Sequence, residues 1–411
     1  MVMPSNGSTM GTVIRRAGDI RTPDRIVYGH DRIDAVGSFA ADHYLTSALV
    51  VTDSTIRAAG ALEPVTAALE AASVEIDWYD GVEPEPRLEM PTEAADRLRT
   101  GEHDLVIGCG GGSAMDTAKV AAVLAEHDVP IRNVLGMGNV PGRGRPIVLC
   151  PTTAGTGSEV THIGVFADKD DDGVKRVVYD EALFADLAVL DPALTATLPP
   201  RVAGATGLDA LTHAIEAYVS VRRTPYADVL AERAIELIGD NLRQAVHQGP
   251  QADDARLSML FGSMLAGQAF VNAGLGAVHA LTYPIGIEFG LGHGEANAMV
   301  LPHVMEFNRH AIPRRYARIA DLLGGPSTGR IDDRAAMSVE LVTELSVAVD
   351  IPPTIGDLGD IDEAMIDRFV DIAFEYSPHN IERNPRRMDR SDAANIFRRA
   401  RAGIPTSDGT T

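Results

Sequence analysis

The chain has 411 residues and a formal net charge of −22, from 58 acidic and 36 basic side chains. This length predicts two or three domains, and 45% apolar residues exclude global disorder, which needs low hydrophobicity together with high net charge. The negative charge argues against nucleic acid and anionic membranes as partners, because both bind cationic patches. The start of the chain lacks a signal-peptide apolar core, and no run reaches the ~18 apolar residues of a spanning helix.

Two features of the composition point to the cellular setting. The two cysteines, Cys109 and Cys150, lie in apolar runs, which suits a reducing compartment, so we expect a cytoplasmic protein. The basic residues comprise 33 arginines and three lysines, Lys119, Lys169 and Lys175. High acid content with so little lysine indicates adaptation to molar salt, although a GC-rich genome would also favour arginine. A lysine retained in such a chain is a candidate site residue.

Short β-rich runs alternate with helical patterns in the first half of the chain. Strands are expected at residues 25–28, 48–52, 74–79, 105–109, 147–150 and 188–190, with a hairpin formed by residues 165–167 and 176–179. Strands separated by helices predict a mostly parallel sheet covered on both faces. After Pro199 the strand runs stop and helical patterns fill the rest, for example at residues 228–238. We therefore predict an α/β domain over residues 1–199 and an all-helical domain over residues 200–411.

Two loops of glycine and hydroxyl residues follow predicted strands. The first, GCGGGSAMDTAK, opens a helix expected to run to about residue 125, and its glycines let backbone N–H groups approach a pyrophosphate at the helix N-terminus. The alternative is a tight turn with Ser113 as N-cap and Asp116 as a first-turn acid. The second loop, PTTAGTGSE, offers Thr152, Thr153 and Thr156 as hydroxyl donors, although it could also be only a polar loop. Ligands of open α/β sheets bind at the carboxyl ends of strands, where both loops lie.

Asp53 ends another predicted strand, ALVVTD. An acid at this position can bind the ribose hydroxyls of a dinucleotide and repel a 2′-phosphate, which favours NAD over NADP. It could also be the N-cap of the following helix, and the two roles are compatible.

A carboxylate and three imidazoles indicate a metal site in the second half. Asp209 and His213 are four residues apart in GLDALTHAIEAY, which places them on one helical face. His279 and His293 follow, and the set suits a first-row divalent ion acting as a Lewis acid. With 12 histidines present, an Asp/His pair can arise by chance, and Glu216, one turn from His213, competes with Asp209 as the carboxylate ligand.

Together these motifs resemble the iron-containing (group III) alcohol dehydrogenase family of the dehydroquinate synthase-like superfamily. The resemblance rests on GGGSAMDTAK, PTTAGTGSE, GLDALTHAIEAY, the His279/His293 pair 14 residues apart, and NPRR at 384–387. Within the family, VNAGLGAVHALTYPIG is most similar to lactaldehyde:propanediol oxidoreductase-type members. The expected activity is metal-dependent, NAD(H)-linked interconversion of a small alcohol and its aldehyde or ketone, in a homo-oligomer. Iron is the expected ion, with zinc as an alternative.

The resemblance also implies individual site residues. It implies Asp209, His213, His279 and His293 as metal ligands and a set of dinucleotide contacts, namely Asp53, Gly111, Gly112, Ser113, Asp116, Thr152, Thr153, Thr156 and Lys175. It places Phe270 in the substrate pocket.

The sequence departs from the family pattern at two positions. Tyr283 stands where many members have a histidine near the nicotinamide, so Tyr283 is a candidate proton donor. Ile163 stands where propanediol-type members have a polar pocket residue, which predicts a more apolar pocket. Four alternatives remain: a hydroxyacid dehydrogenase or transhydrogenase, a polyol (glycerol-type) dehydrogenase, a dehydroquinate synthase-like lyase, and a catalytically inactive binding protein on the same fold.

Overall fold

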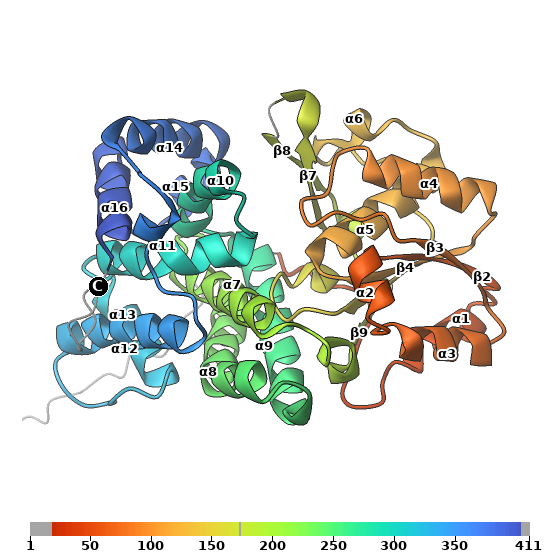
Figure 1. Cartoon of the computed structure of the whole chain (residues 1–411), viewed down its shortest axis with the longest axis horizontal. Coiled ribbons are helices and arrows are strands. Elements are labelled where there is room, and N and C mark those ends of the chain that lie inside the picture. Colours follow the sequence, from red (N-terminus) through yellow and green to blue (C-terminus); the bar gives the residue numbers. More distant parts are fainter. Residues whose placement is uncertain (1–18, 172–173, 404–411) are drawn as a thin grey trace, which may run out of the picture.

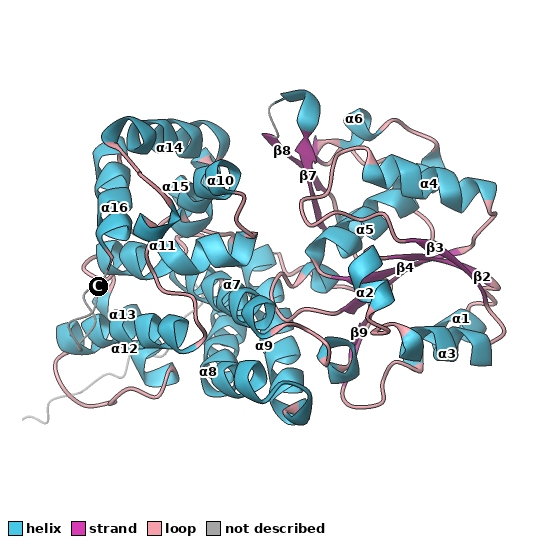
Figure 2. Ribbon diagram, in the orientation of Figure 1, coloured by secondary structure: helices cyan, strands magenta, loops and turns pink. Residues whose placement is uncertain are grey.

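The computed structural model describes residues 19–171 and 174–403. Its amino-terminal half carries a six-stranded parallel sheet, and its carboxyl-terminal half is helical, as Figure 2 shows by colour. The predicted fold class, an α/β part followed by an all-helical part, is confirmed.

The main sheet has the spatial order β1-β9-β6-β4-β2-β3. In that order its strands are Ile26–Tyr28, Leu187–Leu190, Ile147–Pro151, Leu105–Gly110, Ser47–Val51 and Glu75–Tyr79. Successive side chains of a strand point to opposite faces. In β2, Leu49 and Val51 therefore pack with α4 (Met90–Thr100) and α5 (Gly112–His127). Ala48 and Val50 pack on the other face with α1 (Ala35–Asp42) and α3 (Glu63–Ala71). Burial on both faces explains why the inner strands β2, β4, β6 and β9 are nearly continuous apolar runs.

Helices cover both faces of this sheet (Figure 1). The helices of this half are α1 Ala35–Asp42, α2 Ser54–Ala58, α3 Glu63–Ala71, α4 Met90–Thr100, α5 Gly112–His127 and α6 Ile131–Val134. Four 3₁₀ turns complete it: η1 Ser158–Val160, η2 Lys169–Asp171, η3 Glu181–Leu183 and η4 Pro192–Thr195. The first turn of α5 contacts the loop after β6, which brings the two glycine and hydroxyl loops together.

A second, three-stranded sheet has the order β5-β8-β7. Strands β7 (Ile163–Asp168) and β8 (Val174–Tyr179) pair antiparallel as the predicted hairpin, and β5 (Gly136–Met137) adds a two-residue edge. Residues 172–173 of the acidic turn lie outside the described residues. The hairpin extends toward the helical half of the molecule (Figure 1).

The helical half begins with α7 at Pro200, whose fixed φ and missing N–H suit the first position of a helix. Its helices are α7 Pro200–Val219, α8 Pro225–Gln248, α9 Asp253–Ala273, α10 Ala277–Phe289, α11 His293–Asn308, α12 Pro313–Leu322, α13 Ile331–Ala348, α14 Glu363–Tyr376, α15 Pro378–Arg383 and α16 Arg390–Ala402, with 3₁₀ turns η5 Gly249–Gln251 and η6 Gly356–Leu358. The helix expected at residues 228–238 is part of the longer α8.

No single helix of the described chain is long and apolar enough to cross a membrane. Only α9 and α10 taken together meet the length and composition of a span, and they are bent by 109°.

Candidate functional site

Two backbone loops form a cradle at the carboxyl ends of the neighbouring strands β4 and β6. A Cβ on Gly112 would lie 2.9 Å from Thr156 Cγ2, so glycine is required where the loops meet. Gly157 has a φ of +61°, and a Cβ there would lie 2.7 Å from the Gly267 Cα of α9, which brings this loop against the helical half. The N-cap of α5 is Gly111, with no side-chain cap, so the first N–H groups of α5 have no capping side chain and can bind an anion.

Two of the three threonines of the second loop have hydroxyls without a partner among the described residues. The Oγ1 atoms of Thr152 and Thr153 are buried without a hydrogen-bond partner in the described residues. Buried polar groups are nearly always paired, so these two hydroxyls fit the polar groups of a bound dinucleotide. Thr156 Oγ1 instead accepts a hydrogen bond from the Ser158 N–H at 3.2 Å.

Asp53 lies at the carboxyl end of β2, beside the cradle in the strand order. One carboxylate oxygen accepts the Ile56 N–H at 2.9 Å as the N-cap of α2. Asp53 is therefore an N-cap. Its carboxylate also lies at the carboxyl ends of the strands, as both loops do.

Three other residues of the first motif bond within the protein. The Ser113 hydroxyl donates to the Pro84 carbonyl at 2.7 Å, so Ser113 does not cap α5. The Asp116 carboxylate accepts the Ser158 hydroxyl at 2.6 Å and the Val165 N–H at 3.0 Å. Asp116 therefore joins α5 to the threonine loop and to β7.

Lys119 is fully buried and also bonds only within the protein. Its Nζ lies 2.9 Å from Asp116 Oδ1 and donates to Ser158 Oγ at 2.8 Å and to the Ile163 carbonyl at 2.5 Å. Lys119 thus bonds α5 to the threonine loop and to β7, between the two loops that form the cradle.

Lys175 and Tyr283, which the sequence placed separately in the site, meet at the junction of the two halves. The Lys175 backbone N–H donates to Tyr283 Oη at 2.7 Å, linking β8 to α10. The Lys175 ammonium lies 5.8 Å from the Tyr283 ring centre and 3.3 Å from Glu85 Oε2. Burial raises the pKa of Tyr283, so its hydroxyl keeps its proton.

The four expected metal ligands come together from three helices. Asp209 and His213 lie one turn apart on α7, His279 lies on α10, and His293 is the first residue of α11. One ligand atom from each falls within 4.8 Å of the others. Burial lowers the pKa of His213, which leaves a neutral imidazole with a lone pair, as a cation requires. The residues present therefore fit a divalent ion.

Glu216 is excluded as a competing metal ligand because both of its carboxylate oxygens already accept hydrogen bonds. It accepts N–H groups from Gly276 at 3.0 Å and Val278 at 2.6 Å, at the start of α10, and lies 2.6 Å from His279 Nδ1. A carboxylate on Nδ1 fixes the imidazole tautomer and orients Nε2 toward the cluster. Glu216 thus supports His279, and Asp209 remains the carboxylate in the cluster.

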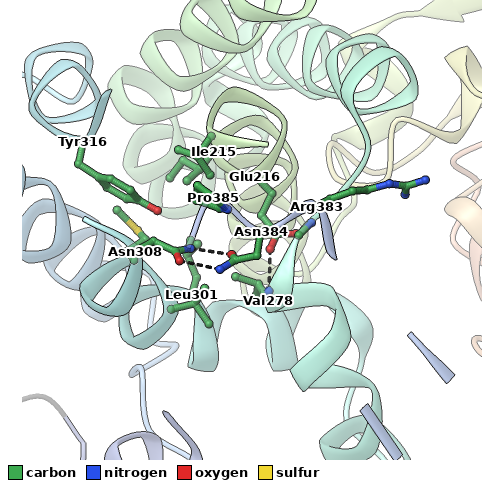
Figure 3. A pocket seen from close by; sticks show the side chains of 13 residues that line it. Ile215, Glu216, Val278, Leu301, Asn308, Tyr316, Arg383, Asn384 and Pro385 are labelled. Carbon is green, nitrogen blue, oxygen red and sulfur yellow. Dashed lines mark hydrogen bonds between the residues drawn. The ribbon is translucent and has the colours of Figure 1, made fainter. Parts of the chain in front are cut away.

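The Asn384 of the NPRR motif lines the same pocket as Glu216 (Figure 3). Its side chain exchanges two hydrogen bonds with Asn308, at 2.8 and 2.7 Å. Both residues line a cavity of about 10 Å³ together with Glu216 and Tyr316, which is about the volume that holds one water. Asn384 of the motif therefore lies in the same cavity lining as Glu216, the residue that contacts His279.

Apolar side chains lie next to the metal cluster. The Phe270 ring lies 4.8 Å from the His213 ring, centre to centre. Ile163 is partly buried and packs against the apolar cluster of the helical half, which contains Phe270. The place of both residues in an apolar substrate pocket stays a prediction.

Sequence reasoning missed two buried polar residues. Asn297 lies among the ligand atoms, one turn after His293 on α11, and its i, i+4 spacing from His293 is the available signal. Glu159, in the threonine loop, is buried, and burial raises its pKa to about 7. Nothing in its sequence context distinguishes it from an exposed loop acid.

Family models match both halves of the chain. Residues 23–192 match the family described as iron-containing alcohol dehydrogenase, and residues 203–401 match the C-terminal region of the Fe-containing alcohol dehydrogenase family. The chain is 43% identical over 359 residues to long-chain-alcohol dehydrogenase 1 of Geobacillus thermodenitrificans, covering 86% of this chain and 89% of that one.

Two solved structures share the fold. The crystal structure of a 1,3-propanediol oxidoreductase has a TM-score of 0.90 at 36% identity, covering 94% of this chain and 100% of that one. An archaeal halo-thermophilic alcohol dehydrogenase from a Red Sea brine pool has a TM-score of 0.84 at 27% identity, covering 94% and 99%.

Proposed function

The chain belongs to the iron-containing alcohol dehydrogenase family, an NAD- and iron-dependent family of oxidoreductases, and from that premise we propose how its own residues divide the work. The observation that carries the proposal is the contact between the two sites. His213 of the metal cluster has its Nδ1 3.2 Å from the carbonyl of Gly155, which lies in the threonine loop of the cradle. His213 and the threonine loop would therefore hold the ion and the dinucleotide next to each other, as hydride transfer requires.

The metal cluster and the cradle have separate tasks. The ion would be held by Asp209, His213, His279 and His293. When bound, it would act as a Lewis acid on the alcohol oxygen. Thr152, Thr153 and Thr156, with Gly111 and Gly112, would hold the dinucleotide, and Ser113, Asp116 and Lys175 would support its cradle. Oxidation of the alcohol would transfer a hydride to the nicotinamide and release the hydroxyl proton. Positioning of the reactants and electrostatic stabilisation would then supply most of the rate enhancement.

Tyr283 is our candidate for handling a proton near the nicotinamide. Its Oη accepts the Lys175 N–H, so its own proton remains available to a ligand oxygen. The comparisons favour neither the hydroxyacid, polyol and lyase alternatives nor an inactive binding protein. The direct test of the function is NAD⁺ reduction by a panel of primary alcohols, diols and hydroxyacids with added Fe²⁺ or Zn²⁺.

For the substrate, we propose an apolar primary alcohol in preference to a diol. Phe270 and Ile163 would give the pocket apolar walls, since Phe270 lies beside His213 and Ile163 packs against the same apolar cluster. The relative from Geobacillus thermodenitrificans is named for long-chain alcohols. An Ile163→Asn variant should lower kcat/KM for 1-hexanol by roughly tenfold and lower it less for 1,3-propanediol, since pocket contacts of this size change discrimination by about 1–3 kcal/mol. Equal effects on both substrates would contradict the assignment of Ile163 to the pocket.

Asp53 should set the preference for NAD over NADP. An Asp53→Ser variant keeps an oxygen to cap α2 but removes the negative charge, so kcat/KM should fall roughly tenfold for NAD⁺ and rise for NADP⁺. Asp362→Ser is the matched control, because Asp362 caps α14 in the same way by accepting the Met365 N–H. An unchanged cofactor ratio in Asp53→Ser would remove Asp53 from the cofactor site.

The charge suits a salt-rich cytoplasm, and we propose that the enzyme works there. The chain carries a net charge of −22, and screening by salt removes the mutual repulsion of its carboxylates. Both cysteines are free and buried, as suits a reducing compartment. Raising KCl from 0.1 M to about 2 M should raise the thermal midpoint by several degrees. A midpoint independent of KCl would contradict salt adaptation.

We also propose a domain boundary at Pro199 and a homo-oligomer. The two family matches end at 192 and start at 203, on either side of Pro199. Strands β1 and β3 are the outer strands of the main sheet, and open sheet edges need a cover. Light scattering on the purified chain distinguishes an oligomer from a monomer.

A further inference from the structure

Asn297 is a buried amide inside the metal cluster to which no role has so far been assigned. Its side chain has no exposed surface. Its Nδ2 donates to Asp209 Oδ1 at 2.7 Å and lies 3.2 Å from the Nε2 atoms of both His279 and His293. One neutral side chain therefore contacts three of the four residues that would hold the ion.

The chemistry of its neighbours fixes which end of the amide faces the cluster. An ionised carboxylate only accepts hydrogen bonds, so the amide nitrogen of Asn297 must point toward Asp209. On the other side, the Thr282 hydroxyl donates to Asn297 Oδ1 at 2.6 Å. Thr282 is itself buried and comes from α10, so the amide is held by a second helix.

The cluster also needs a donor when no cation is bound. The Nδ1 atoms of His279 and His213 face acceptors, Glu216 Oε2 at 2.6 Å and Gly155 O at 3.2 Å. Their protons are therefore on Nδ1, and the lone pairs on Nε2 point inward. With Asp209 these lone pairs form a buried group of acceptors, which is costly without donors.

We propose that Asn297 is a positioning residue of the metal centre. One of its N–H groups donates to Asp209 Oδ1, and the other lies near the Nε2 atoms of His279 and His293. These contacts orient the ligand atoms toward the centre of the site before the ion binds. The bond to Asp209 uses one lone pair of Oδ1 and leaves another for the ion. The amide adds no charge, and the ion would replace its N–H at the single lone pair of each imidazole Nε2 while the bond to Asp209 remains. This inference rests on the metal centre of the proposed function.

The test is the affinity of the metal-stripped full-length chain for Zn²⁺, measured by competition with a chromogenic chelator. Asn297→Ala should bind Zn²⁺ roughly 10–100-fold more weakly than the natural chain, the usual effect of losing a group that orients a ligand. In the Co²⁺-loaded protein, the same variant should show altered visible absorption, because the geometry of the ligands changes.

A second pair of variants separates positioning from folding. Thr282→Val removes the hydroxyl that holds the amide and keeps the volume, so it should also weaken Zn²⁺ binding, and Thr282→Ser should restore it. Thr343→Val is the matched control, because Thr343 is a buried helical threonine whose hydroxyl bonds only the Val339 carbonyl four residues earlier.

The outcomes distinguish the two proposals. A natural chain that binds no Zn²⁺ would overturn the metal centre itself. A natural chain that binds Zn²⁺, with Asn297→Ala and Thr282→Val within twofold of it, would overturn the role of Asn297 alone. Weakened binding in both variants, with Thr343→Val unchanged, supports it.

Discussion

Replacing His279 by alanine should lower kcat for NAD-linked alcohol oxidation by roughly 10³-fold or more. The imidazole is one of four side chains whose ligand atoms fall within 4.8 Å, and Glu216 orients it by a 2.6 Å contact to Nδ1. A bound ion stabilises the transition state by several kcal/mol, and each 1.36 kcal/mol is a factor of ten in rate. Steady-state rates with saturating NAD⁺ and Fe²⁺ measure the effect.

His303→Ala is the matched control for that experiment. His303 is also a buried histidine, on α11, but its Nε2 faces the Pro353 carbonyl at 2.8 Å, away from the cluster. This variant should lose stability and keep its rate when folded. Comparable kcat values for the natural chain and a folded His279→Ala would rule out metal-centred chemistry at this site.

The second large effect is expected for stability and concerns Lys119. A Lys119→Met variant should lower the free energy of unfolding of the α/β half by about 3–5 kcal/mol, because removing one partner of a buried ion pair leaves the other charge uncompensated. Here Asp116 would lose its cation, and the Ser158 and Ile163 acceptors would lose their donor. The single tryptophan, Trp78 in β3, reports urea unfolding of this half by its fluorescence.

Lys169→Met provides the comparison for Lys119. The Lys169 side chain is 63% exposed and lies 3.6 Å from Glu83, and exposed pairs contribute about 0–1 kcal/mol. We expect its urea midpoint to match that of the natural chain. A Lys119→Met midpoint equally close to that of the natural chain would show that the buried lysine does not hold the two loops together.

Much of the fold could be predicted because its strands are buried on both faces. Continuous apolar runs such as residues 105–109 leave few alternatives to a central strand, and the structure has β4 at Leu105–Gly110. The two-residue β5 could not be predicted, since Gly136 and Met137 have no β pattern of their own and pair only because β8 lies beside them. The stretch expected at residues 228–238 is shorter than α8, whose buried face continues through Leu242, Ala245 and Val246.

The spacing of residues along α7 does not decide between Asp209 and Glu216 as the carboxylate ligand of the metal. Asp209 and Glu216 both lie one turn from His213, so helical geometry allowed either as a ligand. The deciding fact is the approach of α10, whose first N–H groups occupy Glu216. That approach is a tertiary contact between segments 60 residues apart, which no local pattern encodes.

Lys119 and Asn297 are two further residues whose roles the sequence alone does not determine. The scarcity of lysine drew attention to Lys119, but scarcity cannot distinguish a ligand contact from a buried structural cation, and the structure shows the latter. Asn297 is not among the predicted site residues, because asparagine is common on protein surfaces. Only the convergence of α7, α10 and α11 places its amide beside Asp209 and two histidines.

The central claim is that this chain transfers hydride from an alcohol to NAD⁺ with the help of an ion held by Asp209, His213, His279 and His293. The most direct measurement follows deuterium from a C1-deuterated primary alcohol into NADH, using the chain stripped of metal and then the same sample reloaded with Fe²⁺. The account predicts deuterated NADH in the reloaded sample and almost none in the stripped one. Equal formation of NADH in both samples, or NADH without deuterium, would contradict it.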